Sequence, residues 1–224
     1  MCQARQSKEY IISRNRNDKL IVVIKRDDLF GQDFFEGFRQ QEEIDYESRI
    51  LNKFEYMAKK PAEKNPAYKQ PIGYSLVVDR AQKKVFAYQR PYQDSRYSEK
   101  RLQGKWSWGI GGHIDKHDVK TGNPIHASVL RELEEEINIG DAINLKRLGY
   151  INNEDEVGRV HFGILHVVET ETSIMKAKDP EIDNGRMRTI EELSKLCVSS
   201  DFLVEEWSRI CLGPLKEYLT ETEF

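Results

Sequence analysis

Two neighbouring stretches are the most informative part of this chain: Gly109-Ile110-Gly111-Gly112-His113-Ile114-Asp115 and Asn123-Pro124-Ile125-His126-Ala127-Ser128-Val129-Leu130-Arg131-Glu132-Leu133-Glu134-Glu135-Glu136-Ile137. Residues 106–114 predict a short strand that runs into a glycine turn, and residues 124–137 predict a helix. Asn123 is a good N-cap because its side chain accepts a hydrogen bond from an unpaired amide. Pro124 suits the first helical position because it has no amide proton to lose. The start of the helix is therefore well specified.

The predicted helix is apolar on one face and carries Glu132, Glu135 and Glu136 together on another. Carboxylates on adjacent turns repel one another, and hard divalent cations such as Mg²⁺ or Mn²⁺ are their natural neutralisers. Arg131 lies four residues before Glu135, where it can pair with that carboxylate and orient it. The double glycine lets the backbone approach the same point, so the Gly112 carbonyl could contact the cation.

A glutamate-rich helix face is by itself most often a solvated surface. Here, however, the order Gly-Gly-His, a spacer, then Arg-Glu-Leu-x-Glu-Glu-x-x-Ile resembles the signature of the Nudix hydrolases, which cleave nucleoside diphosphates linked to another moiety. The core of that signature matches fully at 131–136. The wider segment 69–114 is similar to a little-characterised Nudix branch whose members are described as predicted phosphoesterases.

Two positions depart from the family pattern. Asn123 stands where the signature has its first glutamate, and Asn138 stands where it has a late glycine. The spacer between Gly112 and Arg131 is also about five residues longer than usual. Asn123 keeps a capping role, and asparagine tolerates the left-handed conformation that a glycine after a helix supplies. Neither departure removes an expected metal ligand.

The resemblance implies a fold of the α+β type, a Nudix-like α/β/α sandwich with a mixed β-sheet. It implies that Mg²⁺ or Mn²⁺ is held by Glu132, Glu135 and Glu136, with Gly112 beside them, and that Arg131 orients a glutamate. A further acid from a late loop would assist, and Glu181 is our candidate. Whether the general base is Glu132 or the loop acid varies within the family, so the base is left unassigned.

Cationic residues before the glycine turn are candidates for substrate binding. Arg90, Arg101 and Lys105 could contact phosphates, and arginine is suited to bidentate contact. Solvated loop charges are an equally good interpretation for each of them. The expected partner is a small-molecule diphosphate, in particular a nucleotide derivative.

The rest of the chain mixes strands and helices without a regular βαβ alternation, which favours a mixed sheet covered by helices. We expect one domain over 1–224, in which an N-terminal strand and helix extension, 1–68, packs on a core at 69–224. Patterns of apolar residues predict hairpins over 8–28 and 72–88, a helix over 45–60, paired strands at 143–151 and 157–168, and a helix from 201 that Gly213-Pro214 interrupts. The capping-box pattern Thr189-Ile190-Glu191-Glu192 predicts a further helix that runs to about Leu196.

Composition narrows the class of protein further. The 224 residues include 38% hydrophobic ones, enough for one sizeable core, and the net charge of −3 gives no overall attraction to nucleic acid or to an anionic membrane. The longest aliphatic run, Leu20–Ile24, is too short to span a bilayer. Cys2, Cys197 and Cys211 form no CxxC pair, so we expect free thiols and a cytoplasmic protein.

Several alternatives stay open. A non-catalytic module that binds or senses a nucleotide or nucleotide sugar is the main one, because of the two asparagine departures. Isomerisation of isopentenyl diphosphate would need a catalytic cysteine in the core and ranks low. Trp106, Trp108 and Tyr88 either stack on a base or pack in a sheet. The five histidines have no recognised zinc-ligand spacing and are expected to be structural or exposed. The phenylalanine-rich stretch 30–38 is core, lid, annex contact or the surface of a homodimer.

Overall fold

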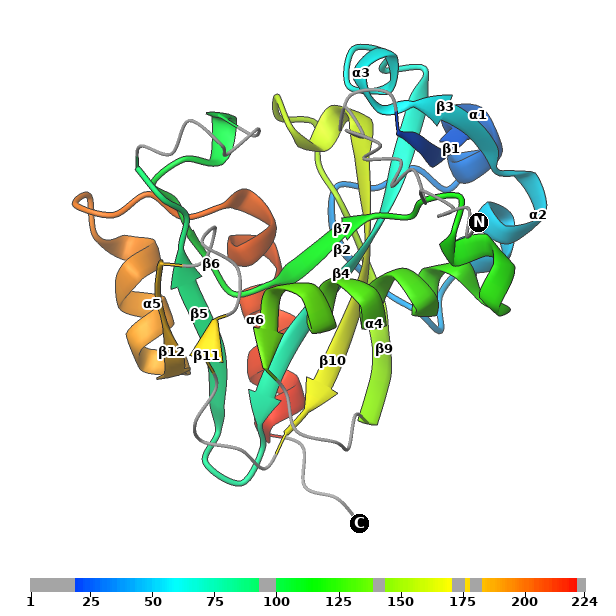
Figure 1. The fold of residues 1–224 in the computed structure, drawn as a ribbon. Helices are drawn as coiled ribbons and strands as arrows, with labels where there is room; N and C mark the ends of the chain where they lie inside the picture. Colours follow the sequence, from blue (N-terminus) through cyan, green and yellow to red (C-terminus); the bar gives the residue numbers. More distant parts are fainter. Residues whose placement is uncertain (1–18, 93–99, 139–143, 171–175, 178–182, 221–224) are drawn as a thin grey trace, which may run out of the picture.

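A mixed β-sheet forms the centre of the molecule (Figure 1). The computed structural model describes residues 19–92, 100–138, 144–170, 176–177 and 183–220. The elements follow in this order: β1 (Leu20–Lys25), α1 (Arg26–Phe30), β2 (Gly37–Gln40), α2 (Tyr46–Lys53), β3 (Glu55–Ala58), α3 (Lys59–Ala62), β4 (Tyr68–Asp79), β5 (Lys84–Gln89), η2 (Lys100–Leu102), β6 (Trp106–Ser107), β7 (Ile110–His113), η3 (Asp118–Thr121), α4 (Pro124–Glu136), β8 (Ile137–Asn138), β9 (Asn144–Asn152), η4 (Gly158–Val160), β10 (His161–Glu169), β11 (Lys176–Ala177), β12 (Asp183–Thr189), α5 (Ile190–Val198) and α6 (Glu206–Thr220).

The main sheet has the strand order β12-β5-β4-β10-β9-β2. β10 is parallel to β4, whereas β5, β9, β12 and β2 are antiparallel to their neighbours in this order. β7 and β6 extend the sheet through antiparallel pairing with β4 and β5 respectively. The sheet is therefore mixed, as the absence of a βαβ alternation predicts.

Helices cover both faces of this sheet, and the side chains of the central strand β4 alternate between the two faces. Leu76 packs in the apolar cluster that holds the buried residues of α5 and α6, and the next residue, Val77, packs in the cluster that holds Val129 and Leu133 of α4. Figure 1 shows α4 crossing one face and α6 lying behind the sheet. The predicted α/β/α sandwich is confirmed.

The N-terminal segment shares a hydrophobic core with the rest of the chain. β1 pairs with β3 and with the start of β4. Phe30 and Phe35 are buried together with Tyr150 and Phe162 of the main sheet, whereas Phe34 is exposed. Core packing thus accounts for Phe30 and Phe35. The boundary at residue 68 and the homodimer stay predictions.

Four hairpin and helix predictions agree with the structure. β4 and β5 form the hairpin predicted over 72–88, and α4 begins at Pro124 as predicted. β9 and β10 are the predicted antiparallel pair. α5 starts behind Thr189, where the hydroxyl accepts a hydrogen bond from the amide of Glu192 and the Glu192 carboxylate accepts one from the Thr189 amide.

Three predicted elements are wrong in their extent. The helix over 45–60 ends at Lys53, because Glu55–Ala58 forms β3 and supplies backbone partners to β1. The strand over 106–114 is split into β6 and β7, because the chain changes partner from β5 to β4 between them. Pro214 does not end the last helix. α6 continues through it, since the following turns bury Leu215 and Tyr218 in the core.

The hairpin over 8–28 is described only from residue 19 onward, where β1 pairs with distant strands. None of the helices in the described ranges is long and apolar enough to cross a membrane. Cys197 and Cys211 form no disulfide in the structure, whereas Cys2 lies outside its described residues.

Candidate active site

A pocket of about 340 Å³ lies where β7 and α4 meet the N-terminal segment and the start of α6. Acidic and basic side chains line it together with a few apolar ones. The predicted site residues that line it are Arg90, Lys105, Gly112, Arg131, Glu132, Glu135 and Glu136. These residues, far apart in sequence, thus face a single cavity.

Gly112 lies against the carboxylate of Glu132. A Cβ atom at position 112 would lie 2.2 Å from Oε1 of Glu132 and 2.3 Å from its Cδ. The backbone of Gly112 lies in β7, opposite Gly73 of β4. The glycine is therefore required for space rather than for an unusual backbone conformation, and it brings backbone atoms next to the carboxylates of α4.

Arg131 fixes the position of Glu132 through a network that the sequence did not predict. Its Nε and Nη2 donate to the two carboxylate oxygens of Asp118, each over 3.0 Å, and Nη2 also donates to the carbonyl of His113 over 3.0 Å. Its Nη1 donates to Oε1 of Glu132 over 2.5 Å, whereas Oε1 of Glu135 is 3.7 Å away. Arg131 therefore orients Glu132 more directly than the predicted Glu135.

Asp118 belongs to the long spacer between the two signature stretches. Its carboxylate also accepts a hydrogen bond from the amide of Asp115 over 2.8 Å, and the side chain of Asp115 accepts one from the amide of His117 over 2.7 Å. The spacing Asp-x-x-Asp is the signal that could have identified this turn. The extra spacer residues thus form a support for Arg131.

Burial and neighbouring charges shift the pKa values of Arg131 and Glu132 in opposite directions. Burial raises the pKa of Glu132, and the guanidinium of Arg131 works against that increase. Burial would lower the pKa of Arg131, but Asp118 and Glu132 hold it above the usual value. Arg131 is therefore a permanent positive charge beside a carboxylate that water reaches poorly.

The three candidate phosphate-binding residues differ in their surroundings. Arg90 lines the pocket, and its Nε donates to Oε1 of Glu205 over 2.8 Å. Lys105 lines it from the adjacent backbone segment, whose carbonyl accepts from the amide of Arg90. Arg101 is not among the described lining residues, and its guanidinium donates to Glu63 and to the carbonyl of Glu156.

Glu181 lies outside the described residues, so its role stays a prediction. Within the described chain, acids from the later sequence reach the pocket at Glu205 and Glu206, where α6 begins. Trp207 lines the pocket as well, and its ring meets that of Tyr74 edge to face at 5.3 Å. Sequence reasoning missed these residues because they are adjacent to no motif.

Trp106, Trp108 and Tyr88 are buried in the packed sheet. These rings therefore pack in the sheet and are not available to stack on a nucleotide base. Burial also raises the pKa of the Cys211 thiol, and neither Cys211 nor Cys197 is among the described lining residues. Neither thiol thus fits the isomerase reading.

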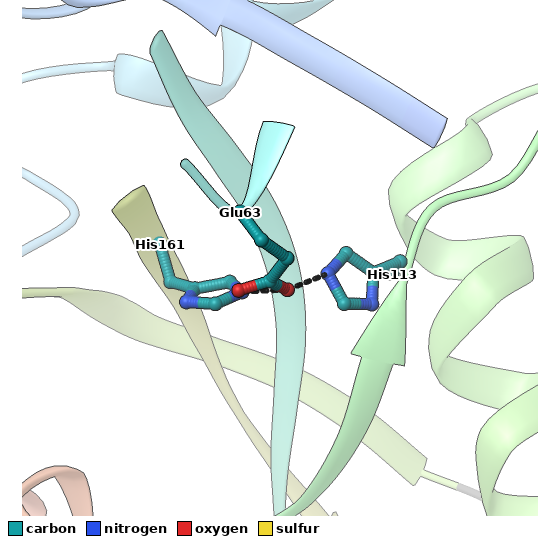
Figure 2. Close-up of side chains that lie close together, drawn as sticks. All are labelled: Glu63, His113 and His161. Carbon is teal, nitrogen blue, oxygen red and sulfur yellow. Dashed lines mark ion pairs between the residues drawn. The ribbon is translucent and has the colours of Figure 1, made fainter. Parts of the chain in front are cut away.

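Two of the five histidines meet a carboxylate at the pocket wall. Figure 2 shows Glu63 between His113 and His161, with Oε1 of Glu63 3.6 Å from Nε2 of His113 and 3.4 Å from Nε2 of His161. Burial lowers the pKa of His113 to about 3. The expectation of structural or exposed histidines took no account of this contact, because Glu63 lies 50 residues before His113 in the chain.

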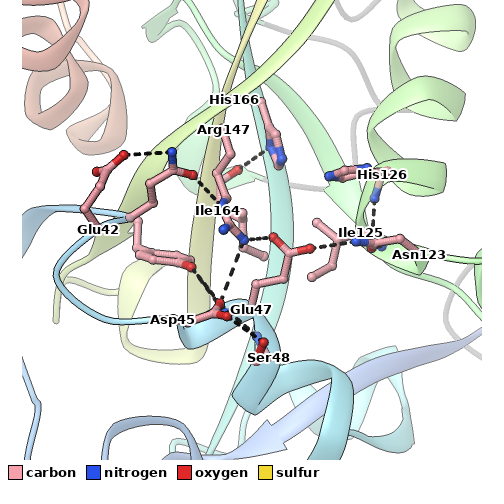
Figure 3. Close-up of polar contacts among 12 residues, drawn as sticks. Glu42, Asp45, Glu47, Ser48, Asn123, Ile125, His126, Arg147, Ile164 and His166 are labelled. Carbon is pink, nitrogen blue, oxygen red and sulfur yellow. Dashed lines mark hydrogen bonds and ion pairs between the residues drawn. The ribbon is translucent and has the colours of Figure 1, made fainter.

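The Asn123 cap connects α4 to the N-terminal segment. Its Oδ1 accepts hydrogen bonds from the amides of Ile125, over 2.9 Å, and His126, over 3.4 Å. Its Nδ2 donates over 2.6 Å to Oε1 of Glu47, a buried side chain that also pairs with Arg147 (Figure 3). Asn123 is not among the residues described as lining the pocket. The other departure, Asn138, lies in β8, so this position does not use a left-handed conformation.

Comparison with known proteins gives the family. Residues 69–205, more than half of the chain, match the model of the NUDIX domain. The chain is 32% identical over 212 residues to the protein YmaB of Bacillus subtilis (strain 168). The alignment covers 89% of this chain and 98% of YmaB.

Solved structures agree with this result. The crystal structure of Tm1382, a protein assigned to the Nudix hydrolases, superposes with a TM-score of 0.71 at 26% identity, covering 89% of this chain and all of the other. The NUDIX domain of Shewanella oneidensis NrtR, solved with ADP ribose, superposes with a TM-score of 0.51 at 15% identity over 68% of this chain and 89% of the other. The second likeness concerns the fold alone.

The chain therefore belongs to the Nudix family. By that membership it is a Nudix-type pyrophosphohydrolase, an enzyme class that hydrolyses phosphoric anhydrides. Its signature helix is α4, and the glycines of its signature lie in strand β7 rather than in the predicted turn.

Replacing Gly112 by alanine tests the contact between β7 and α4. The added Cβ would overlap the Glu132 carboxylate, which must then turn away from the pocket, so we expect turnover to fall about 10- to 100-fold. Circular dichroism and thermal melting should show a folded protein. Gly213→Ala is the matched control, because a Cβ at that helical position meets nothing within 4 Å. Unchanged turnover in Gly112→Ala would contradict the assigned contact.

Replacing Asn123 by aspartate separates its two contacts. Aspartate caps a helix as well as asparagine does, but here it would bring a second carboxylate against buried Glu47. We expect the free energy of unfolding to fall by about 1–3 kcal/mol in urea titrations. Adding Glu47→Gln to Asn123→Asp should recover part of the loss. A single variant as stable as the wild type would mean that the Glu47 contact contributes nothing.

Proposed function

We propose that this protein is a metal-dependent hydrolase that cleaves the diphosphate linkage of a nucleoside diphosphate joined to another moiety. The observation that carries the proposal is the division of charge in one pocket. Three carboxylates of α4 lie together with the backbone of Gly112, and Lys19, Lys59, Lys105 and Arg90 line the same cavity. Such a pocket suits a cation and a polyanionic ligand at the same time.

The donor atoms of α4 fit Mg²⁺ or Mn²⁺. These hard cations prefer oxygen ligands, and Glu132, Glu135 and Glu136 offer carboxylates beside the backbone of Gly112. When bound, such a cation neutralises charge on phosphate oxygens and makes nearby water more acidic. We propose these four residues as its ligands.

The remaining residues would act on geometry and charge. Arg131, held by Asp118, keeps the carboxylate of Glu132 directed toward the pocket. Lys105 and Arg90 would bind phosphate oxygens, although the Arg90 guanidinium already forms an ion pair with the Glu205 carboxylate. Arg101, which pairs with Glu63, is a weaker candidate for phosphate binding. The general base is left between Glu132 and a later acid such as Glu181.

A second reading is a module that binds a nucleotide or nucleotide sugar without cleaving it. The sequence argument for it was the two asparagine departures, of which Asn123 here caps α4 and contacts Glu47, while Asn138 lies in β8. The Asn123 departure therefore offers little support for a loss of catalysis. A cytoplasmic location and a homodimer remain predictions that accompany the proposal.

The decisive assay follows release of phosphate-containing products from nucleoside triphosphates, dinucleoside polyphosphates, ADP-ribose, NADH and nucleotide sugars. Each compound is tested with Mg²⁺, with Mn²⁺ and with a chelator. Glu135→Gln should reduce turnover by about 100-fold or more, because a ligand that holds several kcal/mol of charge stabilisation is lost. Retained activity in this variant would reject the proposed role of the cluster.

Glu134→Gln is the matched control for this assay. It makes the same chemical change on the same helix, at an exposed residue that is not among those lining the pocket. We expect its turnover to stay within about twofold of the wild type. Binding of one compound without cleavage of any would favour the sensing module instead.

A further inference from the structure

A second group of potential metal ligands lies in the pocket wall, apart from the carboxylates of α4. Glu63 follows α3, His113 ends β7, and His161 begins β10. Their ligand atoms all lie within 4.8 Å of one another, and all three residues line the pocket. Figure 2 shows both imidazole rings directed toward the same carboxylate.

Two of the three separations in this group match those of ligands around an ion, and the third pair of atoms lies within 4.8 Å. Oε1 of Glu63 is 3.4 Å from Nε2 of His161 and 3.6 Å from Nε2 of His113. Both distances are long for hydrogen bonds. Ligands that bind zinc at about 2.0–2.2 Å in tetrahedral geometry lie about 3.3–3.6 Å apart. One ion between the three atoms would therefore need little rearrangement.

His161 already has the tautomer that a metal ligand needs. Its Nδ1 lies 2.8 Å from the carbonyl oxygen of Val157. A carbonyl only accepts hydrogen bonds, so Nδ1 carries the proton and Nε2 presents its lone pair to the group. A backbone carbonyl that holds the outer nitrogen is a common arrangement behind histidine ligands.

The other two side chains are oriented by polar neighbours as well. Arg101 donates over 2.9 Å to Oε2 of Glu63, which leaves Oε1 facing the histidines. Oε1 of Gln70 lies 2.8 Å from Nε2 of His113, and this fully buried amide has no partner for its Nε2 among the described residues. The Gln70 oxygen accepts this hydrogen bond, so metal binding requires His113 to move its proton from Nε2 to Nδ1.

We propose that Glu63, His113 and His161 bind a divalent transition-metal ion, distinct from the cation of the α4 carboxylates. Two imidazoles and one carboxylate are a donor set that selects Zn²⁺, Fe²⁺ or Co²⁺ over Mg²⁺. Because the three side chains line the pocket, the open coordination position faces the bound ligand. The pocket would thus hold a hard cation on one wall and a softer one on another.

The chain contains a matched control pair. His126 and His166 lie with ring centroids 5.7 Å apart, close to the 5.4 Å between His113 and His161. In that pair too, Nδ1 of one ring, His166, meets a backbone carbonyl (Figure 3). It differs in having no carboxylate that completes a three-ligand group in the described part of the chain.

The test is binding of Zn²⁺ by calorimetry and of Co²⁺ by visible absorption, on the full chain without substrate. Excess Mg²⁺ is present to occupy the α4 carboxylates. We expect one tight Zn²⁺ site in the wild type and in Glu135→Gln and His126→Gln. Glu63→Gln and His161→Gln should each weaken it at least about tenfold, since loss of a ligand should cost no less than loss of an outer partner.

The competing results are distinct. No Zn²⁺ site in the wild type, or equal affinity in folded Glu63→Gln and His161→Gln, would overturn the proposal. Loss of the site in Glu135→Gln alone would assign the ion to α4 and overturn it too. Thermal melting identifies variants that fail to fold. If either Glu63→Gln or His161→Gln fails to fold, the other variant still tests the site. The readout is independent of turnover, so a failed hydrolase assay leaves it intact.

Discussion

The close approach of α4 to the sheet is the constraint on which the site depends. A Cβ atom at Gly73 of β4 would lie 2.5 Å from Cγ2 of Val129, and one at Gly112 of β7 would overlap Glu132. The two glycines face each other across the pairing of β4 with β7. Their missing side chains let one turn of α4 pack its apolar face on the strands while the next residues bring carboxylates to the backbone of Gly112. The same contact thus serves both packing and the site.

Much of this arrangement follows from local sequence. Asn123 and Pro124 specify where α4 begins, and the Arg131–Glu136 pattern fixes which residues face the pocket. Capping and helical periodicity act over a few residues, so they are visible in one sequence. The hairpin of β4 and β5 and the capping box at Thr189 are local in the same sense.

The rest depends on contacts between distant parts of the chain. Residues 55–58 continue a helical periodicity, but pairing with β1 makes them a strand. Pro214 would end an isolated helix, but burial of Leu215 outweighs its cost. Glu63 meets His113 and His161 only because α3, β7 and β10 converge. No spacing rule connects such residues, and the partners of Arg131 and Arg90 were likewise set by tertiary structure.

In the proposed function, the α4 carboxylates hold the cation that serves hydrolysis. The most direct measurement is anomalous diffraction from crystals grown with Mn²⁺ and a non-hydrolysable nucleoside diphosphate derivative. We expect a Mn²⁺ peak within bonding distance of the α4 carboxylates and of the ligand's phosphate oxygens. A peak found only between Glu63, His113 and His161, or phosphates bound without any cation at α4, would contradict it.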